Sequence, residues 1–364
     1  GHRWGLRVLA VHVDDGFDSE VTKENLRRLV AATGFDYLTV RPDPEQFGAL
    51  TKAYMRSGVP NLAVPQDNVL FSFLYKRARQ FGVRYFAAGT NHALESVLEK
   101  ENTHSAHDLV NLRDIWSKFG HGRIDRLELM SSFDRRMLRA FRVVETVHPL
   151  NLVDYQKDKA LRELTDFCGF QYYGGKHLEN RLTEFAQLYW FPKKFGVDKR
   201  KSHLSSLIVS GQLTRDEALA ELSRPLHEEA EMDACVAFVR ERLSMNGREF
   251  EEIIASPARQ HSHYRVQERT LPYRIAKALG RLLGRPRSES LASNGSENAR
   301  LRRLSRPGQP RARLRASDDL GPEGGVRRVG WRRLLVWSSG PYASGSTKAL
   351  GEASGASGDR CAGR

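Results

Sequence analysis

The sequence predicts an α/β protein with a doubly wound, mainly parallel sheet, followed by a helical region and a disordered basic tail. Dense apolar runs are typical of strands covered on both faces, and here they alternate with segments of helical periodicity. From about residue 150 the pattern becomes helical only, and after about residue 270 most periodicity is lost. We therefore expect three parts, at 1–150, 151–268 and 269–364.

The first part opens with a strand, a helix and a second strand. The apolar run 6–13 (LRVLAVHV) predicts a buried strand that ends at Asp14-Asp15-Gly16. A helix should begin after Ser19, a typical N-cap, and end at Gly34. Residues 35–40 predict the next strand, because prolines punctuate the chain directly after it.

A third apolar strand, 83–88, follows two helices predicted around 47–55 and 67–82. It leads into Gly89-Thr90-Asn91. In doubly wound sheets, ligands bind beyond the carboxyl ends of the strands. Asp14-Asp15 stands in the same relation to the first strand, so we expect both motifs to face one cleft. Either motif alone is also typical of an ordinary turn.

The second part consists of predicted helices. They are expected at 157–167, 176–190 (ended by Pro192), 202–210, 228–243 and 247–254, with one more opened by the capping box 214–217. One short basic helix is also compatible with 275–283. The tail from residue 271 holds 17 Arg, 2 Lys and 14 of the 30 Gly. Such a composition buries too little apolar surface to offset its ordering entropy, so the tail is predicted to be disordered.

The net charge of +14 is concentrated in the tail. Residues 271–364 contain 19 basic and 7 acidic residues, a net of +12, which leaves +2 for the rest. A nearly neutral body with local basic blocks favours a site for a small anion over a surface for a polyanion. Nucleic acid is therefore not an expected partner.

The three cysteines, Cys168, Cys235 and Cys361, are far apart and form no C-x-x-C pair. This spacing predicts neither a disulfide framework nor a zinc site, so no metal-ligating residues are assigned. No apolar run approaches the roughly eighteen residues of a membrane-spanning helix. A reduced, cytoplasmic setting is the expectation.

Two basic blocks stand out in the second part. In the first, 172–181, His177 and Arg181 are four residues apart, so a helix beginning here would place them on one face. Two glycines and helix-start amides beside them suit an anion. The second block, 192–203, packs five basic residues and one His into twelve positions. A phosphate or carboxylate clamp, a nucleic-acid patch and a solvated surface all remain open for it.

Three stretches of this chain resemble the N-acetyl sugar amidotransferases of bacterial surface polysaccharide and flagellar sugar biosynthesis. They are LRVLAVHVDDGFDSE, VPQDNVLFSFLYKRARQFGVRYFAAGTN and YYGGKHLENRLTEFAQLYWFPKKFGVDKRKSHLSSLIVSGQLTRDEAL, and the resemblance covers about 5–260. It implies a core of the PP-loop (HUP-like) ATP pyrophosphatase type over 1–150 and a family-specific substrate region over 151–268.

The resemblance also implies a reaction. Such an enzyme uses ATP and Mg²⁺ to adenylate the oxygen of a sugar acetamido group, and ammonia then displaces AMP to give acetamidino. A HisH-like glutaminase, the type that serves histidine biosynthesis, would supply the ammonia, with or without a HisF-like subunit. The substrate would be an acidic nucleotide-sugar in O-antigen, lipopolysaccharide or flagellin sugar biosynthesis.

The resemblance assigns site residues but no catalytic residue. Residues that would border the adenosine are Val13, Asp14, Asp15, Gly89, Thr90 and Asn91. Residues that would bind pyrophosphate or the sugar substrate are Lys176, His177, Arg181, Lys193, Lys194, Arg200 and Lys201.

One departure from the family pattern matters for ATP. The phosphate-binding loop Ser-Gly-Gly-x-Asp-Ser normally precedes the strand that starts here near Leu6, and without it backbone amides cannot cradle the phosphates. We expect either that this loop lies upstream of Gly1 or that the chain is an inactive fragment. Two alternatives stay open: a PP-loop tRNA-modifying enzyme, and a non-catalytic scaffold for a glutaminase.

Overall fold

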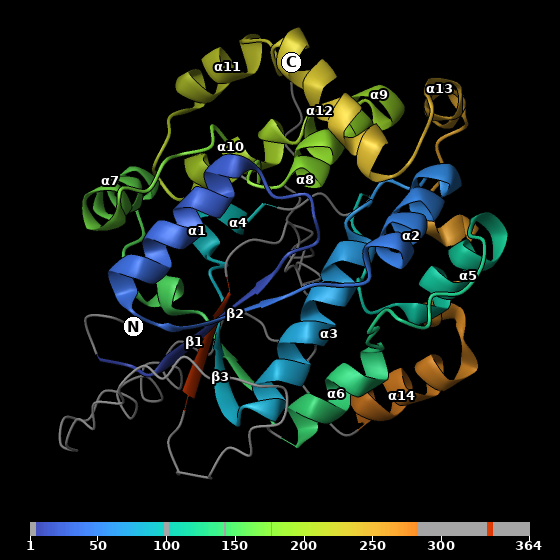
Figure 1. Cartoon of the computed structure of the whole chain (residues 1–364), viewed down its shortest axis with the longest axis horizontal. Helices are drawn as coiled ribbons and strands as arrows, with labels where there is room; N and C mark the ends of the chain where they lie inside the picture. Colours follow the sequence, from blue (N-terminus) through green and yellow to red (C-terminus); the bar gives the residue numbers. More distant parts are fainter. Residues whose placement is uncertain (1–4, 98–101, 142, 176, 283–332, 338–364) are drawn as a thin grey trace, which may run out of the picture.

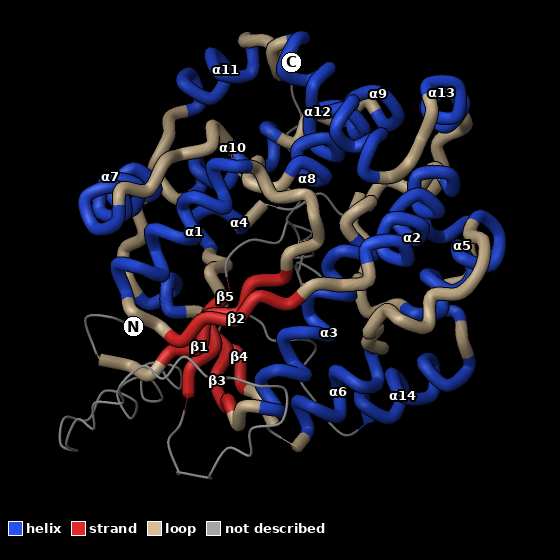
Figure 2. Tube along the Cα trace, viewed as in Figure 1, coloured by secondary structure: helices blue, strands red, loops and turns tan. Residues whose placement is uncertain are grey.

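The computed structural model describes residues 5–97, 102–141, 143–175, 177–282 and 333–337 (Figure 1). A five-stranded sheet has the order β2-β1-β5-β3-β4, and every pairing between neighbours is parallel (Figure 2). The strands are β1 (Val8–Val13), β2 (Asp36–Val40), β3 (Val83–Ala87), β4 (Glu145–Val147) and β5 (Arg333–Trp337). A mixed α/β fold with a small parallel sheet is therefore confirmed, as are the three strands predicted at 6–13, 35–40 and 83–88.

Strand β1 is paired on both sides, which explains its continuous apolar sequence. Its register with β2 runs from Leu9↔Asp36 to Val13↔Val40, and on the other side Val8 pairs with Leu334 of β5. Val8, Leu9 and Val11 are buried. Interior strands of a parallel sheet are covered on both faces, so apolar residues occupy consecutive positions.

Two segments of 269–364 have regular structure, which differs from the predicted disorder. Helix α14 spans Leu271–Leu282, and β5 lies between β1 and β3 with the pairs Val11↔Trp337 and Phe86↔Leu335. Average composition hides the short apolar run Leu334-Leu335-Val336-Trp337, and an apolar run of this kind suits a strand with two neighbours. The rest of the predicted tail lies outside the described residues.

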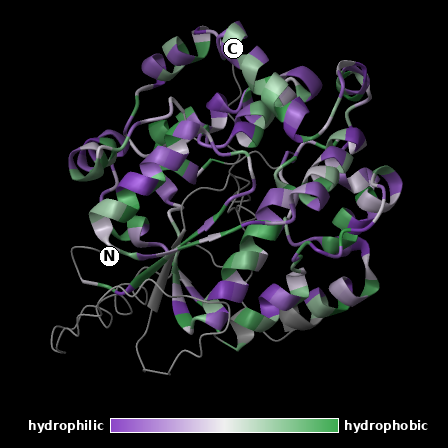
Figure 3. Cartoon of the chain, in the orientation of Figure 1, coloured by the Kyte–Doolittle hydropathy of each residue, from purple (hydrophilic) through white to green (hydrophobic). Residues whose placement is uncertain are grey.

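Of the helices in the first half, the one at Val64–Gln80 packs against strands β1 and β3. Helix α1 begins at the N-cap Ser19, whose side chain accepts from Thr22 N, and ends at the left-handed Gly34. Helix α3 is mostly buried, although hydrophobic and hydrophilic residues both occur along it (Figure 3). The bounds are α1 (Glu20–Thr33), α2 (Pro44–Ser57), α3 (Val64–Gln80), α4 (His92–Glu95), α5 (Leu109–Phe119) and α6 (Ser132–Ala140).

The second half is helical, as predicted. Its elements are η1 (Pro149–Leu152), α7 (Lys157–Cys168), α8 (Arg181–Phe185), η2 (Ala186–Trp190), α9 (Phe191–Phe195), α10 (Arg200–Val209), α11 (Arg215–Ser223), α12 (Glu229–Arg242), α13 (Gly247–Ala255), η3 (His261–His263) and η4 (Gln267–Arg269). The capping box of Thr214 and Glu217 is present. Fully buried Trp190 donates to Val59 O at 3.0 Å, which ties this half to the first. None of the described helices is both long and apolar enough to cross a membrane.

The helix predicted over 176–190 begins later than expected. His177 has φ 64°, in the left-handed region, so a helix cannot include it. Asn180 is the N-cap instead, and its side chain accepts from the amides of Leu182 and Thr183. The prediction that His177 and Arg181 share a helix face is therefore wrong. Pro192 does not end the helical run either. It lies in the first turn of α9, where the backbone N–H that proline lacks is not needed for a hydrogen bond within the helix.

Candidate functional site

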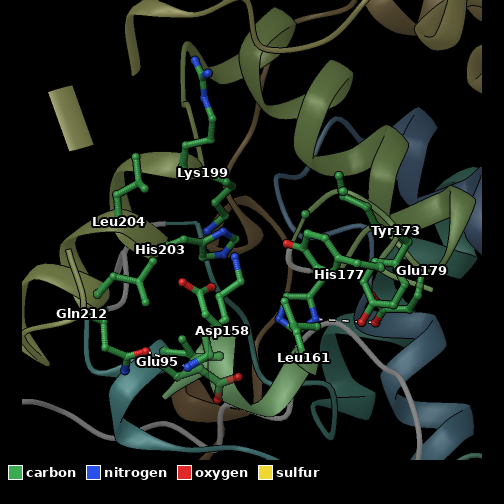
Figure 4. Close-up of a pocket in the computed structure, with 18 of the residues that line it drawn as sticks. Glu95, Asp158, Leu161, Tyr173, His177, Glu179, Lys199, His203, Leu204 and Gln212 are labelled. Carbon is green, nitrogen blue, oxygen red and sulfur yellow. Dashed lines mark hydrogen bonds and ion pairs between the residues drawn. The ribbon is translucent and has the colours of Figure 1, made fainter. Parts of the chain in front are cut away.

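A cavity of about 1340 Å³ opens beyond the carboxyl end of β3 (Figure 4). Gly89 and Thr90, directly after the strand, form part of its wall, and the N-terminal half of α1 forms another part. Helices α7, α10 and α11 and the segments 170–175 and 177–179 supply most of the remaining wall. The site therefore lies where ligands bind in open parallel sheets, but most of its wall comes from the helical half.

The side chains of His177 and Glu179 form an acid–base pair that projects into this cavity. Nδ1 of His177 is 3.7 Å from Oε1 of Glu179, and the two side chains are 21% and 7% exposed. The other carboxylate oxygen of Glu179, Oε2, is buried. Burial, and then the charge of Glu179, raise the pKa of the neighbouring Tyr173 hydroxyl. The tyrosine therefore stays protonated and remains a hydrogen-bond donor at neutral pH.

The backbone holds Glu179 in place from the other side. Its carbonyl oxygen accepts from Ser19 N at 3.1 Å and from the Thr22 hydroxyl at 2.7 Å. The start of α1 therefore fixes the segment that carries His177 and Glu179. This contact joins residues 157 positions apart, so it exists only in the folded chain.

Helix α10 supplies a second polar group. Lys199, at its N-cap, is only 6% exposed, and its ammonium lies 4.9 Å from the ring centroid of Phe191. His203 is one helical turn further on, and its ring centroid is 6.2 Å from that of His177. Lys199 and His203 both line the cavity and face it in Figure 4. A buried lysine and two histidines therefore gather on one wall.

Apolar side chains, mostly leucines, form the greater part of the cavity wall, and the charged residues among them are nearly balanced in sign. Its cationic residues are Lys157, Lys159, Arg162, Lys199, Arg200 and Arg224, and its acidic residues are Glu95, Asp158, Glu179, Glu217 and Glu221. Its aromatic residues are Tyr155, Phe170, Tyr172 and Tyr173. Mixed donors and acceptors beside aromatic faces suit a polyhydroxylated, partly charged ligand better than a bare polyphosphate.

The six residues assigned to adenosine do not meet in one cavity. Gly89 and Thr90 line the large one, and the Thr90 hydroxyl is 2.8 Å from Nδ1 of His148. Asn91 is 5% exposed and caps α4 by accepting from Leu94 N. Val13 and Asp15, at the end of β1, line a separate, much smaller cavity.

Asp14 is already paired. Its carboxylate accepts from the Arg41 side chain at 2.8 Å and from Gly16 N at 3.2 Å. Despite partial burial, these contacts lower the pKa of Asp14. Asp14 therefore serves the turn after β1, and its assignment to the nucleotide stays a prediction.

Two of the basic residues assigned to pyrophosphate or substrate make structural contacts. Lys194 donates to the carbonyls of Ile253 and Ser256 at 2.9 and 2.6 Å, which caps the end of α13. Arg200 lines the cavity, but its guanidinium binds Asp198 and the carbonyl of Arg224. The first contact satisfies helix-end carbonyls, and the second anchors the end of α11.

The other basic residues are not gathered around the cavity. Arg181 pairs with Glu184 at 2.8 Å, and its amide donates to Phe17 O. Lys193 is exposed beside the Tyr189 ring, and Lys201 is exposed on α10. Of the seven, only His177 and Arg200 line the cavity among the described residues. Lys176 lies outside the described residues.

Binding of ATP and Mg²⁺ stays a prediction from the resemblance. The described residues contain no group of three or more His, Cys, Asp or Glu side chains that could hold a metal ion. The amides at the start of α8 are capped by Asn180, and the carboxylates after β1 are paired or buried. We therefore derive no step through these groups.

The fold and the cavity together define an α/β protein with a ligand-sized site, apolar with charged groups, beyond the carboxyl end of a strand in a parallel sheet. Residues 179–279 match a family profile described as "LPS biosynthesis protein WbpG-like, C-terminal domain". A search of curated proteins finds no match. The similarity supports a relation to lipopolysaccharide biosynthesis. The matched segment contains Glu179, Lys199 and His203, so it supplies much of the cavity wall.

Four of the cavity's polar residues were not predicted as site residues: Tyr173, Glu179, Lys199 and His203. The four-residue spacing of Lys199 and His203 is a signal that could have paired them on α10. Glu179 carries no comparable signal, because its position depends on the contacts with Ser19 and Thr22.

Proposed function

We propose that this protein acts as an N-acetyl sugar amidotransferase in lipopolysaccharide biosynthesis and that the large cavity binds its acidic nucleotide-sugar substrate. One observation carries the proposal: the segment similar to WbpG-like proteins and the residues after β3 line the same cavity. Its volume of about 1340 Å³ exceeds the usual range for drug-sized ligands, about 300–1,000 Å³, and accommodates a nucleotide joined to a sugar.

The lining fits the parts of such a substrate. Lys199 and Lys157 can pair with diphosphate or carboxylate oxygens, and Tyr172 and Tyr173 offer faces for a sugar or base. The Lys157 ammonium already lies 5.2 Å from the ring centroid of Tyr172, so charge and aromatic surface are adjacent.

The pair of His177 and Glu179 suits proton transfer in this reaction. When ammonia adds to the carbon of the acetamido group, the new C–N bond leaves a positive nitrogen that must lose a proton. The imidazole of His177 can accept that proton, and the carboxylate of Glu179 stabilises the resulting cation. We therefore place His177 as the general base and Glu179 as the residue that positions it.

Activation of the amide oxygen by ATP belongs to the proposal but does not rest on the described residues. ATP would turn that oxygen into a good leaving group. Ammonia would come from a glutaminase partner. The cavity residues support only the binding of the sugar substrate.

Calorimetric titration tests the substrate assignment. The probe is a UDP-linked acetamido sugar acid, and UDP-glucose, which has neither the acetamido nor the acid group, is the comparison. We expect the first to bind at least about tenfold more tightly, equivalent to ~1.4 kcal/mol. Lys199→Met should weaken its binding, whereas Lys193→Met, outside the cavity, should not. Equal affinity for the two sugars would argue against the assignment.

A further inference from the structure

Exposed apolar side chains concentrate on two helices, α6 and α14. On α6, Phe133 is 68% exposed and Met137 is also exposed, and Phe141, directly after the helix, is 72% exposed. On α14, Leu271 and Ile275 are 68% and 50% exposed. These five belong to the eleven large apolar residues that are exposed in the described part of the chain. An apolar cluster that a protein leaves in water marks a place where something else binds.

Helical spacing aligns these side chains into a stripe on each helix. Phe133 and Met137 are four residues apart, and the amide of Phe141 donates to Met137 O at 3.0 Å, so the helical turn continues to Phe141. Leu271 and Ile275 are also four residues apart. Both helices are therefore amphipathic, with an apolar stripe that the protein itself does not cover.

The two helices lie against each other. The guanidinium of Arg136 on α6 is 5.2 Å from the ring centroid of Tyr273 on α14, and the helices run side by side in Figure 1. Leu138, on another side of α6, packs against the core and holds this helix to the protein. None of the five exposed apolar residues lines the large cavity. The helices therefore form one surface that is separate from the proposed sugar site.

The same two helices are basic. Their sequences contain one acidic residue, Asp134, and six basic ones: Arg135, Arg136, Arg139, Arg274, Lys277 and Arg281. The carboxylate of Asp134 accepts from the amide and the hydroxyl of Ser131, so it is occupied within its own turn. We call the five exposed apolar residues and these six basic residues the α6–α14 surface.

The chain that follows α14 continues this positive charge. Residues 283–315 lie outside the described residues, but their sequence contains nine arginines and two glutamates, a net of +7. The arginines occur at irregular intervals, so they match no fixed arrangement of acidic groups. The partner of this region must therefore offer negative charge over a wide area, together with an apolar layer.

We propose that the α6–α14 surface binds to an anionic lipid bilayer. Its apolar side chains enter the boundary between headgroups and acyl chains, and its cations pair with lipid phosphates. Long basic side chains reach the phosphates while their stems stay in the apolar layer. Insertion and charge act together, since one such signal alone gives only weak attachment. Binding of this kind needs no membrane-spanning helix, and it does not rest on the proposed function.

Other occupants fit the surface less well. A second copy of the chain, or the arginine-rich segment 283–315, would bring like charge against α14. A nucleic acid would pair with the cations but offers no apolar layer for Leu271 and Ile275. An acidic protein would need a carboxylate opposite each cation, whereas lipid phosphates move and adapt to any spacing.

Co-sedimentation of the full chain with lipid vesicles tests the proposal. One probe is a vesicle of phosphatidylglycerol and phosphatidylcholine in equal parts, and the other is a vesicle of phosphatidylcholine alone. We expect the partition coefficient to be at least about tenfold higher for the anionic vesicle. Binding to the anionic vesicle should also weaken as the salt concentration rises, because salt screens the charges.

Two paired variants assign the binding to the α6–α14 surface. Phe133→Gln combined with Phe141→Gln removes its two most exposed apolar side chains. Arg274→Gln combined with Lys277→Gln removes two exposed cations. Each pair should lower the partition coefficient for anionic vesicles by at least about tenfold.

The matched control replaces exposed apolar residues elsewhere. Val209→Gln combined with Leu219→Gln changes residues that are 70% and 52% exposed on α10 and α11 and that do not line the large cavity. This pair should partition like the wild type. All the variants should keep wild-type affinity for the nucleotide sugar. Circular dichroism identifies any variant that fails to fold, and the comparison of the two vesicles with the wild type then decides alone.

Three results would overturn the proposal. The first is a folded wild type that binds neither vesicle, which would favour an acidic protein as the occupant. The second is equal binding to both vesicles, because charge would then have no part in it. The third is binding to anionic vesicles that the Phe133 and Phe141 pair leaves unchanged, because the cations alone would then account for it. Vesicle binding without binding of the UDP-linked sugar acid would contradict the proposed function and leave this surface intact.

Discussion

Nδ1 of His177 lies 3.7 Å from Oε1 of Glu179, although the backbone of His177 is in the left-handed region that few non-glycine residues adopt. An unfavourable backbone conformation is retained only where the surrounding structure imposes it. Here it turns the imidazole toward the large cavity instead of into the helix that begins at Arg181. The pair is the centre of the proposed site, and the first two predictions concern it.

His177→Asn should lower turnover by about 10²–10⁴-fold, the usual contribution of a general base. Asparagine tolerates the left-handed backbone, so the fold should be preserved. Steady-state kinetics with the nucleotide sugar measure the effect, and kcat should fall more than KM changes. The control is His121→Asn, at an exposed position outside the cavity. Loss of activity in both variants would show that the loss is not specific to His177.

Glu179→Gln should lower the pKa of Tyr173. Burial is the main cause of the raised value and would remain, whereas the charge of Glu179 contributes to it and would be removed. An ultraviolet titration, compared with that of Tyr173→Phe to isolate this residue, measures the shift. An unchanged tyrosine titration would mean that Glu179 and Tyr173 do not interact in solution.

Asp15 should make the protein less stable as the pH rises. Its folded-state pKa of about 6 exceeds the ordinary aspartate value of 3.8, so the folded state binds the proton more tightly. The resulting stabilisation is complete below pH 3.8 and is lost by about pH 6, a change of roughly 3 kcal/mol. Asp15→Asn should remove this contribution. Urea unfolding across that pH range measures it, and identical pH profiles for the two proteins would contradict the raised pKa of Asp15.

Lys194→Met should destabilise the fold by about 1–3 kcal/mol, because it leaves the carbonyls of Ile253 and Ser256 without their donor. Affinity for the nucleotide sugar should not change. Chemical denaturation and calorimetric titration give the two values. A variant that folds with normal stability but binds sugar poorly would restore Lys194 to the binding site.

A strand could be predicted only where its own residues form a recognisable pattern. The apolar runs of β1 and β3 follow from burial within a parallel sheet, whereas β2 is an edge strand in which only Val40 is buried. Strand β4 has three residues and one neighbour, so its sequence, Glu145–Val147, contains no run to detect. Strand β5 lies in a segment whose average composition is typical of disorder.

The site was harder to predict because neighbouring residues have different roles. Lys194 and Lys199 belong to one basic block, yet the first caps α13 and the second lines the cavity. Only the tertiary structure shows that Lys194 and Lys199 have different roles. Similarly, Asp15 and Thr90 both follow strands, but β5 lies between β1 and β3, and the two residues line different cavities.

Saturation-transfer NMR with the UDP-linked acetamido sugar acid tests the central claim most directly, because it reports which ligand protons touch the protein. We predict strong transfer to the acetyl methyl group in the wild type and in Lys193→Met, and weak transfer in Lys199→Met. Absence of transfer to that methyl group, or equal transfer in all three proteins, would contradict the account.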